Sequence, residues 1–362
     1  MREYRPFSQA TLNTAIDKLN QGKLSTLDVQ LGGACNARCM KCDTPNYHAR
    51  NNLDVQALQT HIESGHVDGI SVCGKGEPTS RQNQEKLLYL LKVAKDNGLS
   101  VHAFINGLEI TREMFDYIDD GTFNVLAQFN SLDAKNIIAQ MGLEQLYGRN
   151  AEQMAKSQIE NLHILGEIAK GKSSRDINIG ASIVPETYNE HELGAMFDFC
   201  LERGMSILVG ELENAGKSTG ETYNELVIPK KRLLLVQDMM AERGIPTQTP
   251  LCPYLFSSVH VSNNNRVSAD KTTGSSCSWW NLQDNNMAKK IYFGNIADKS
   301  FEQFSDEIMA HRMSIYPNLK ELSQQDEMPL IGGCGGNTND VMRILTETTA
   351  SAIKTKGSEM VD

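Results

Sequence analysis

Short apolar runs alternate with longer helical patterns along the first 210 residues of this chain, and this order limits the folds open to it. Strands separated by helices of such length run parallel and are joined by right-handed crossovers. Six strands in this order predict a partial barrel. The predicted strands are 27–32, 68–73, 100–105, 123–130, 177–185 and 205–210, and the predicted helices between them are 53–64, 81–98, 111–120, 151–170 and 191–204.

The chain changes character after the last of these strands. A loop rich in Gly, Ser and Thr at 216–222 precedes a helical pattern at 229–244. Asn263-Asn264-Asn265 then separates two alternating runs, which indicates a β-hairpin, and 300–313 is typical of a helix. We therefore predict an α/β fold, a partial (β/α)6 TIM-like barrel with a small α+β C-terminal cap. The predicted units are a lead-in helix at 1–24, the barrel at 25–212, a linker and helix at 213–250, an auxiliary domain at 251–345 and a tail at 346–362.

Charge and hydropathy exclude several classes of protein. The formal net charge of −10 argues against a broad nucleic-acid surface, which is usually basic. No segment approaches the roughly 20 apolar residues of a membrane span, and the N-terminus lacks a signal-peptide pattern. We expect a cytoplasmic protein that binds neither nucleic acid nor membrane. Its 8 unevenly spread cysteines are no disulfide framework, and clustered cysteines in a reducing compartment indicate metal binding or catalysis.

Three cysteines form the strongest motif. Cys35, Cys39 and Cys42 follow the first predicted strand closely, at the end of a parallel sheet where active sites form. Three thiolates on a short loop can reach three corners of a [4Fe–4S] cubane. The fourth iron then lacks a protein ligand and is free to chelate a small molecule.

Other interpretations of these cysteines fit less well. A structural zinc site uses four ligands, yet only Cys39 and Cys42 have the C-x-x-C spacing and no His-x-x-x-His pair is present. A bacterial ferredoxin run continues with x3-Cys-Pro, whereas DTPNYH follows Cys42. Zinc binding and a chance grouping of cysteines remain as alternatives.

The C-x3-C-x2-C spacing after the first strand resembles the signature of the radical S-adenosylmethionine superfamily. In that family the amino and carboxylate groups of S-adenosyl-L-methionine chelate the open iron of a [4Fe–4S] cluster. Reductive cleavage then gives methionine and a 5′-deoxyadenosyl radical, which abstracts hydrogen from a substrate. The resemblance implies both cofactors and an electron donor such as flavodoxin or ferredoxin.

A glycine-rich turn after the second predicted strand supports the resemblance. Gly74-Lys75-Gly76-Glu77-Pro78 looks like the family's Gly-Gly-Glu motif, which meets the amino group of S-adenosylmethionine. Lys75 departs from that motif. The glycines permit close backbone approach, and Glu77 can accept a hydrogen bond from an ammonium group.

Further residues match the family's cofactor site by position. Gln128, Asn130 and Ser131 close the fourth strand and are similar to its ribose-contacting end. Arg149 resembles the arginine that pairs with the cofactor carboxylate, although a solvated charge at a helix start is an equal alternative. Gly180 on the fifth strand would let adenine approach the backbone, or it marks a bulge.

A second set of cysteines lies in the last third of the chain. Cys252, Cys277 and Cys334 resemble the twitch or SPASM extension that carries auxiliary iron–sulfur clusters, and three cysteines allow one such cluster with a fourth ligand from elsewhere. Alternatively they are buried apolar residues, or Cys334 is a catalytic hydrogen-atom donor. Cys73 and Cys200 are expected in the core.

Three functions follow from these motifs. The first is dehydrogenation or epimerisation of a small molecule such as a sugar, aminocyclitol or amino-acid derivative. The second is modification of a ribosomally made peptide, although the 34 residues before Cys35 are too few for the peptide-recognition domain common in such enzymes. The third is an iron–sulfur sensor or electron-transfer protein, against which the glycine-rich turn and the polar end of the fourth strand argue.

Overall fold

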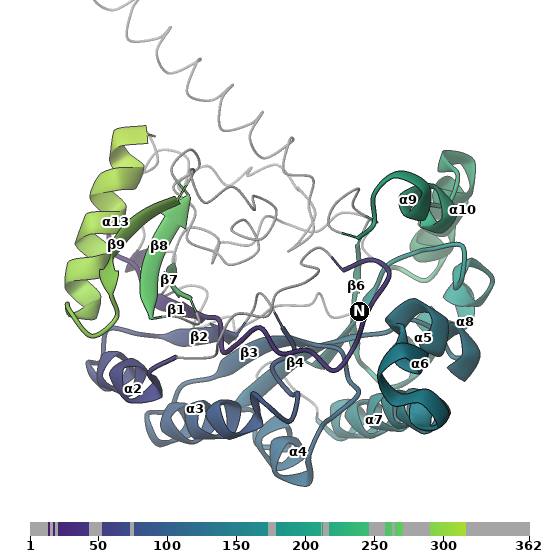
Figure 1. The fold of residues 1–362 in the computed structure, drawn as a ribbon, viewed down its shortest axis with the longest axis horizontal. Helices are drawn as coiled ribbons and strands as arrows, with labels where there is room; N and C mark the ends of the chain where they lie inside the picture. The colour runs from purple at the N-terminus through teal and green to yellow at the C-terminus, as the bar shows by residue number, and fades with distance from the viewer. Residues whose placement is uncertain are drawn as a thin grey trace, which may run out of the picture.

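A curved, mostly parallel sheet forms the centre of the computed structural model (Figure 1). The structure describes residues 14, 17, 18, 21–42, 53–72, 76–172, 179–210, 212, 217–245, 258–262, 265–270 and 290–315. The first six strands run parallel, each beside the next in chain order, which confirms the predicted partial barrel. They are β1 (Thr26–Val29), β2 (Gly69–Val72), β3 (Val101–Ile105), β4 (Phe123–Gln128), β5 (Ile179–Ile183) and β6 (Ser206–Val209).

Helices cover the convex side of this sheet (Figure 1). Capping side chains set several of their starts: Asp54 accepts a hydrogen bond from the Ala57 amide, and Thr111 accepts one from the Met114 amide. The predicted helices are α2 (Val55–Glu63), α3 (Gln84–Asp96), α4 (Arg112–Asp119), α7 (Ala151–Gly171), α8 (Leu193–Glu202) and α10 (Lys230–Glu242). Short elements that the sequence patterns did not predict are α5 (Ala134–Met141), α6 (Leu143–Tyr147), α9 (Gly220–Leu226) and the 3-10 turns η1 (Gly148–Asn150) and η2 (Glu190–Glu192).

The described C-terminal elements continue the same sheet. β7 (Ser258–Val261) and β8 (Arg266–Asp270) pair antiparallel, which confirms the predicted hairpin. β7 also pairs in parallel with β1, and β9 (Lys290–Asn295) pairs antiparallel with β8, so that the sheet has nine strands. Helix α13 (Phe301–Ile315) packs beside them. The boundary of the auxiliary domain stays a prediction.

The two faces of the sheet differ in chemistry. Successive side chains of a strand point to opposite faces, and Leu27, Val29 and Ile70 join the apolar core that includes Leu58 of α2 and Leu87 of α3. The other, concave face carries a row of polar side chains at matched register, which we call the polar row. Its members are His260, Asp28, Ser71, His102 and Asn124, on β7, β1, β2, β3 and β4 respectively.

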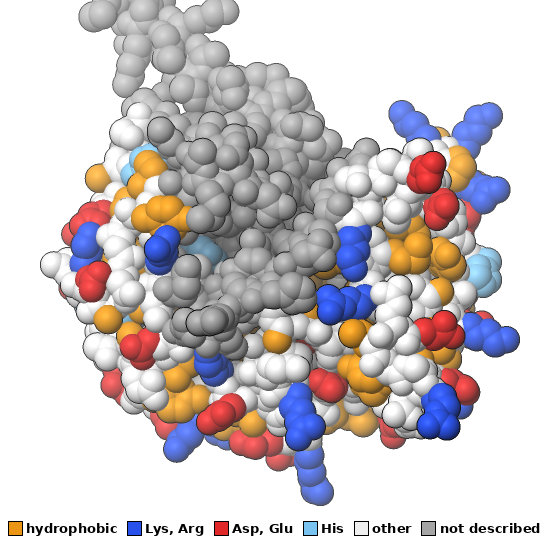
Figure 2. Space-filling model, in the orientation of Figure 1, with side chains coloured by type: hydrophobic (Ala, Val, Ile, Leu, Met, Phe, Trp, Pro, Cys, Tyr) orange, Lys and Arg blue, Asp and Glu red, His pale blue; other side chains and the backbone are white. Residues whose placement is uncertain are grey.

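The outer surface carries charged side chains of both signs (Figure 2). On the face shown in Figure 2, acidic and basic side chains are interspersed and no broad surface of one sign appears. Among the described residues, no helix has the length and apolar character needed to span a bilayer.

Candidate cofactor-binding site

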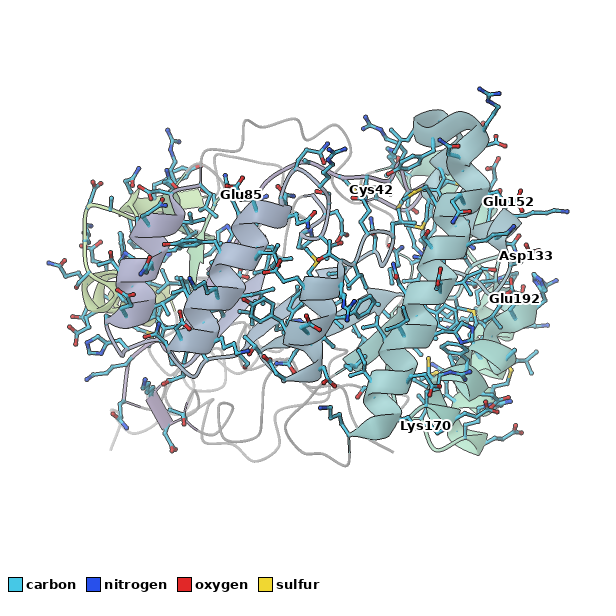
Figure 3. All side chains as sticks on the ribbon, turned by 90° about the horizontal axis from the view of Figure 1, so that it is seen from below. Cys42, Glu85, Asp133, Glu152, Lys170 and Glu192 are labelled. Carbon is cyan, nitrogen blue, oxygen red and sulfur yellow. The ribbon has the colours of Figure 1, made fainter. Side chains whose placement is uncertain are left out.

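The cysteine loop, residues 32–42, lies at the carboxyl end of β1. In Figure 3, Cys42 lies at the same end of the molecule as Glu85 and Glu152, near the starts of α3 and α7, and opposite Lys170 at the end of α7. Because each crossover helix starts near the carboxyl end of the strand before it, the cysteines occupy the edge where parallel α/β folds bind ligands. This is the position that the sequence predicted for them.

The three thiols lie close enough to interact electrostatically. Cys35 is exposed, whereas Cys39 and Cys42 are half-buried. Burial raises the pKa of the Cys39 thiol far above its ordinary value, and the nearby Cys35 and Cys42 raise it further. Three thiolates so placed repel one another and lose hydration, and a bound cationic centre would offset both costs.

The end of α5 supports the cysteine loop from one side. The Arg38 amide donates to the Met141 carbonyl at 2.8 Å, and the Met40 amide donates to the Gln140 carbonyl at 2.9 Å. Gly142 ends α5 with φ +58°, and a Cβ there would lie 2.8 Å from the Arg38 carbonyl oxygen. The loop therefore depends on a helix that the sequence patterns did not predict.

The glycine-rich turn supports the loop from another side. Gly76 has φ +89°, and a Cβ at this position would lie 2.2 Å from the Gly32 carbonyl oxygen. The Glu77 amide donates to the Ala34 carbonyl at 2.8 Å. Close backbone approach thus requires Gly76, and the approaching partner is the cysteine loop. Gly74 and Lys75 lie outside the described residues.

The Glu77 carboxylate is buried and already hydrogen-bonded. It accepts from the Thr79 hydroxyl at 2.6 Å, the Thr79 amide at 3.1 Å and the Asn106 amide at 2.8 Å. Desolvation raises the pKa of Glu77 to about 7, although these hydrogen bonds lower it. A carboxylate offers about four acceptor sites, so three donors leave room for one more.

Of the polar residues at the end of β4, one keeps an unpaired donor and another is used to hold the following turn. The Gln128 amide donates to Asn130 Oδ1 at 2.9 Å, while the fully buried Asn130 Nδ2 donates to no protein group. A buried donor left unpaired costs about 1–3 kcal/mol, which a bound acceptor would recover. Ser131 instead donates to Glu192 Oε1 at 2.6 Å and so helps to fix the turn.

Two other predicted cofactor residues occupy contrasting places. Arg149 is exposed on the turn η1. Gly180 is buried in β5, where it pairs with Leu126 and Ser206 in unbroken register. Gly180 therefore does not mark a bulge.

The remaining cysteines fall into two groups. Cys200 is buried in α8, as predicted for a core residue, and burial raises its pKa to about 12. Cys73, Cys252, Cys277 and Cys334 lie outside the described residues. The auxiliary cluster and the catalytic role of Cys334 stay predictions.

Sequence reasoning missed two cations at the cysteine loop. Lys41, between Cys39 and Cys42, forms an ion pair with Glu186 in the loop after β5. The Lys217 amide donates to the Cys42 carbonyl at 2.9 Å. Lys41 is visible in the motif as a charged residue inside a cluster-binding loop, but no local pattern indicates Glu186.

The donor set fits a [4Fe–4S] cluster together with a polar organic ligand. Three thiols project from one loop, and the buried Asn130 Nδ2 still lacks an acceptor. Among the described residues, no three His, Cys, Asp or Glu side chains are near enough together to hold a single metal ion. A cubane binds each cysteine through a different iron and therefore needs a wider spacing than a mononuclear site.

Comparison with known proteins gives the class of fold. No family model and no curated protein matches the sequence. Streptococcus suis SuiB bound to S-adenosylmethionine is 13% identical, with a TM-score of 0.56 over 84% of this chain and 72% of SuiB. The protein anSMEcpe with bound AdoMet is 12% identical, with a TM-score of 0.52 over 84% of this chain and 88% of anSMEcpe. The chain has the fold of the radical S-adenosylmethionine core.

Proposed function

We propose that this chain is a radical S-adenosylmethionine enzyme whose [4Fe–4S] cluster is held by Cys35, Cys39 and Cys42. The observation that carries the proposal is the placement of three interacting thiols on one loop, at the carboxyl end of a sheet with this fold. When bound and reduced, such a cluster supplies the electron that cleaves S-adenosylmethionine. The chemistry that this cleavage would supply is hydrogen abstraction from the substrate through a 5′-deoxyadenosyl radical.

The chain's own residues would bind and orient S-adenosylmethionine. Asn130 Nδ2 donates to a ribose oxygen, since it is a buried donor without a protein acceptor. Glu77 accepts from the amino group through its remaining acceptor site, and Gly76 lets this turn lie against the cysteine loop. Gly180 would let adenine approach the backbone of β5. Arg149 binds the carboxylate if its exposed side chain turns inward.

The polar row supports a substrate rich in hydrogen-bonding groups. Its side chains occupy matched positions on the concave face of adjacent strands, opposite the helices. Asp28 and His260 within it are buried and 3.1 Å apart between Oδ2 and Nδ1. A sugar, aminocyclitol or amino-acid derivative matches this chemistry, and dehydrogenation or epimerisation is the reaction proposed.

Peptide modification is the second candidate. It is favoured by the likeness to SuiB bound to its precursor peptide SuiA, at 13% identity and a TM-score of 0.54 over 86% of this chain and 71% of SuiB. A peptide also presents many hydrogen-bonding groups, so the polar row does not argue against it. Solvent deuterium at the product carbon would identify an epimerase, whereas loss of two hydrogens would identify a dehydrogenase on either substrate class.

The test is anaerobic reconstitution with iron and sulfide, followed by reduction with dithionite in the presence of S-adenosylmethionine. We expect 5′-deoxyadenosine to be released, and we expect its release to stop when Cys35, Cys39 and Cys42 are all changed to Ala. Absence of 5′-deoxyadenosine from a fully loaded protein would refute the enzyme and leave a sensor or electron carrier. Iron in the triple variant tests the auxiliary cluster: about four irons per chain support it, and near zero refutes it.

A further inference from the structure

A buried ion pair adjoins the proposed cluster. Lys41 and Glu186 have side chains only 10% and 1% exposed. In every other Lys or Arg ion pair within the described ranges, both side chains are at least 20% exposed. This pair joins the cysteine loop to the loop that follows β5.

Fold stability alone does not explain a buried pair of this kind. Removing two charges from water costs about as much as their attraction returns, and apolar replacements are often neutral or stabilising. The cysteine loop also has other attachments, through the carbonyls of Met141 and Gln140 and the amide of Lys217. A charged pair at this position therefore points to an electrostatic role.

The cation lies nearer to the thiols than the anion does. Lys41 belongs to the cysteine loop itself, next to Cys42 and two residues from Cys39, whereas Glu186 lies in the loop that follows β5. Glu186 belongs to a turn in which its amide donates to Asn189 Oδ1 at 2.8 Å. Asn189 in turn donates to the Asn130 carbonyl at 2.9 Å. The anion is thus fixed on the β4–β5 side, whereas the cation lies within the cysteine loop.

We propose that the Lys41–Glu186 pair sets the reduction potential of the cluster bound by the cysteine loop. The inference rests on the proposed function. A positive charge stabilises the reduced, more negative cluster and so raises its potential. Glu186 holds the Lys41 ammonium in place and cancels part of its field, so that the two residues act with opposite sign.

The test measures the midpoint potential by EPR-monitored titration of the reconstituted full-length protein without S-adenosylmethionine. The signal followed is the one absent from the triple cysteine variant. We expect E186Q, which is isosteric and leaves the cation uncompensated, to raise the potential. K41M should lower the midpoint potential by at least about 59 mV, which is a tenfold change in the equilibrium constant of a one-electron reduction. The double variant should fall below wild type and no lower than K41M.

Matched controls come from the exposed pair of Lys95, in the last turn of α3, and Asp120, at the end of α4. K95M and D120N should leave the potential unchanged, and K41R, which keeps the charge, should stay near wild type. If K41M binds no iron, E186Q still decides the sign of the change in potential. The proposal is overturned if E186Q lowers the potential, or if E186Q moves it no more than the control variants do. Failure of the wild type to bind a cluster would instead refute the proposed function.

Discussion

Replacement of Gly76 by alanine tests whether the glycine-rich turn supports the cysteine loop. A Cβ at this position would lie 2.2 Å from the Gly32 carbonyl oxygen and 2.8 Å from that of Ala34, against 3.4–4 Å for ordinary contact. Both obstacles are backbone atoms, so relief requires movement of the loop. The left-handed φ of +89° adds strain of its own.

Backbone strain and overpacking together set the expected loss of unfolding free energy in G76A. Left-handed backbone costs an alanine about 1–2 kcal/mol, and overpacking costs about 1–3 kcal/mol more, for a total of about 2–5 kcal/mol in the free energy of unfolding. Gly98 is the matched control, because it has φ +67° and nothing within 4 Å of its Cβ position. Its alanine variant should lose only about 1–2 kcal/mol.

Urea denaturation and iron analysis of both variants provide the measurement. We expect G76A to lose more stability than G98A and to bind less iron after reconstitution, while G98A binds as much as wild type. Equal losses of stability together with full iron binding in G76A would show that the turn does not constrain the loop.

Three further perturbations have defined outcomes. Burial lowers the pKa of His102 to about 3. Below about pH 6.5 the unfolded chain binds a proton at this imidazole and the folded chain does not. The free energy of unfolding therefore falls as the pH drops from 7, by about 2 kcal/mol at pH 5. H102Q should therefore flatten the dependence of urea stability on pH. D28A removes a buried acceptor from His260 and should cost about 1–3 kcal/mol in unfolding free energy. N130A should weaken binding of S-adenosylmethionine about tenfold in calorimetry of the reconstituted protein, because it removes the buried donor.

Each of these expectations has a contrary result. Identical slopes for wild type and H102Q between pH 7 and 5 would contradict the buried neutral imidazole. A D28A protein as stable as wild type would show that the Asp28–His260 contact contributes nothing to the packing of β7 on β1. Unchanged binding in N130A would place the ribose elsewhere.

Local patterns predicted the barrel strands well. The observed strand cores lie within the predicted ranges, except that Thr26 extends the first range by one residue. Apolar runs of this kind are readable because strands buried on one face must carry aliphatic side chains there. The short helices α5 and α6 were missed because eight and five residues, separated by the left-handed Gly142, carry too little periodicity to detect.

The sequence by itself determined the order of strands and helices and the spacing of Cys35, Cys39 and Cys42, because both are relations between near neighbours in the chain. Only the tertiary structure decided that β7 lies beside β1. It likewise decided that Lys41 meets Glu186, 145 residues away. Such contacts depend on how the sheet curves and which loops meet at its edge, and a pattern read along the chain does not contain that information.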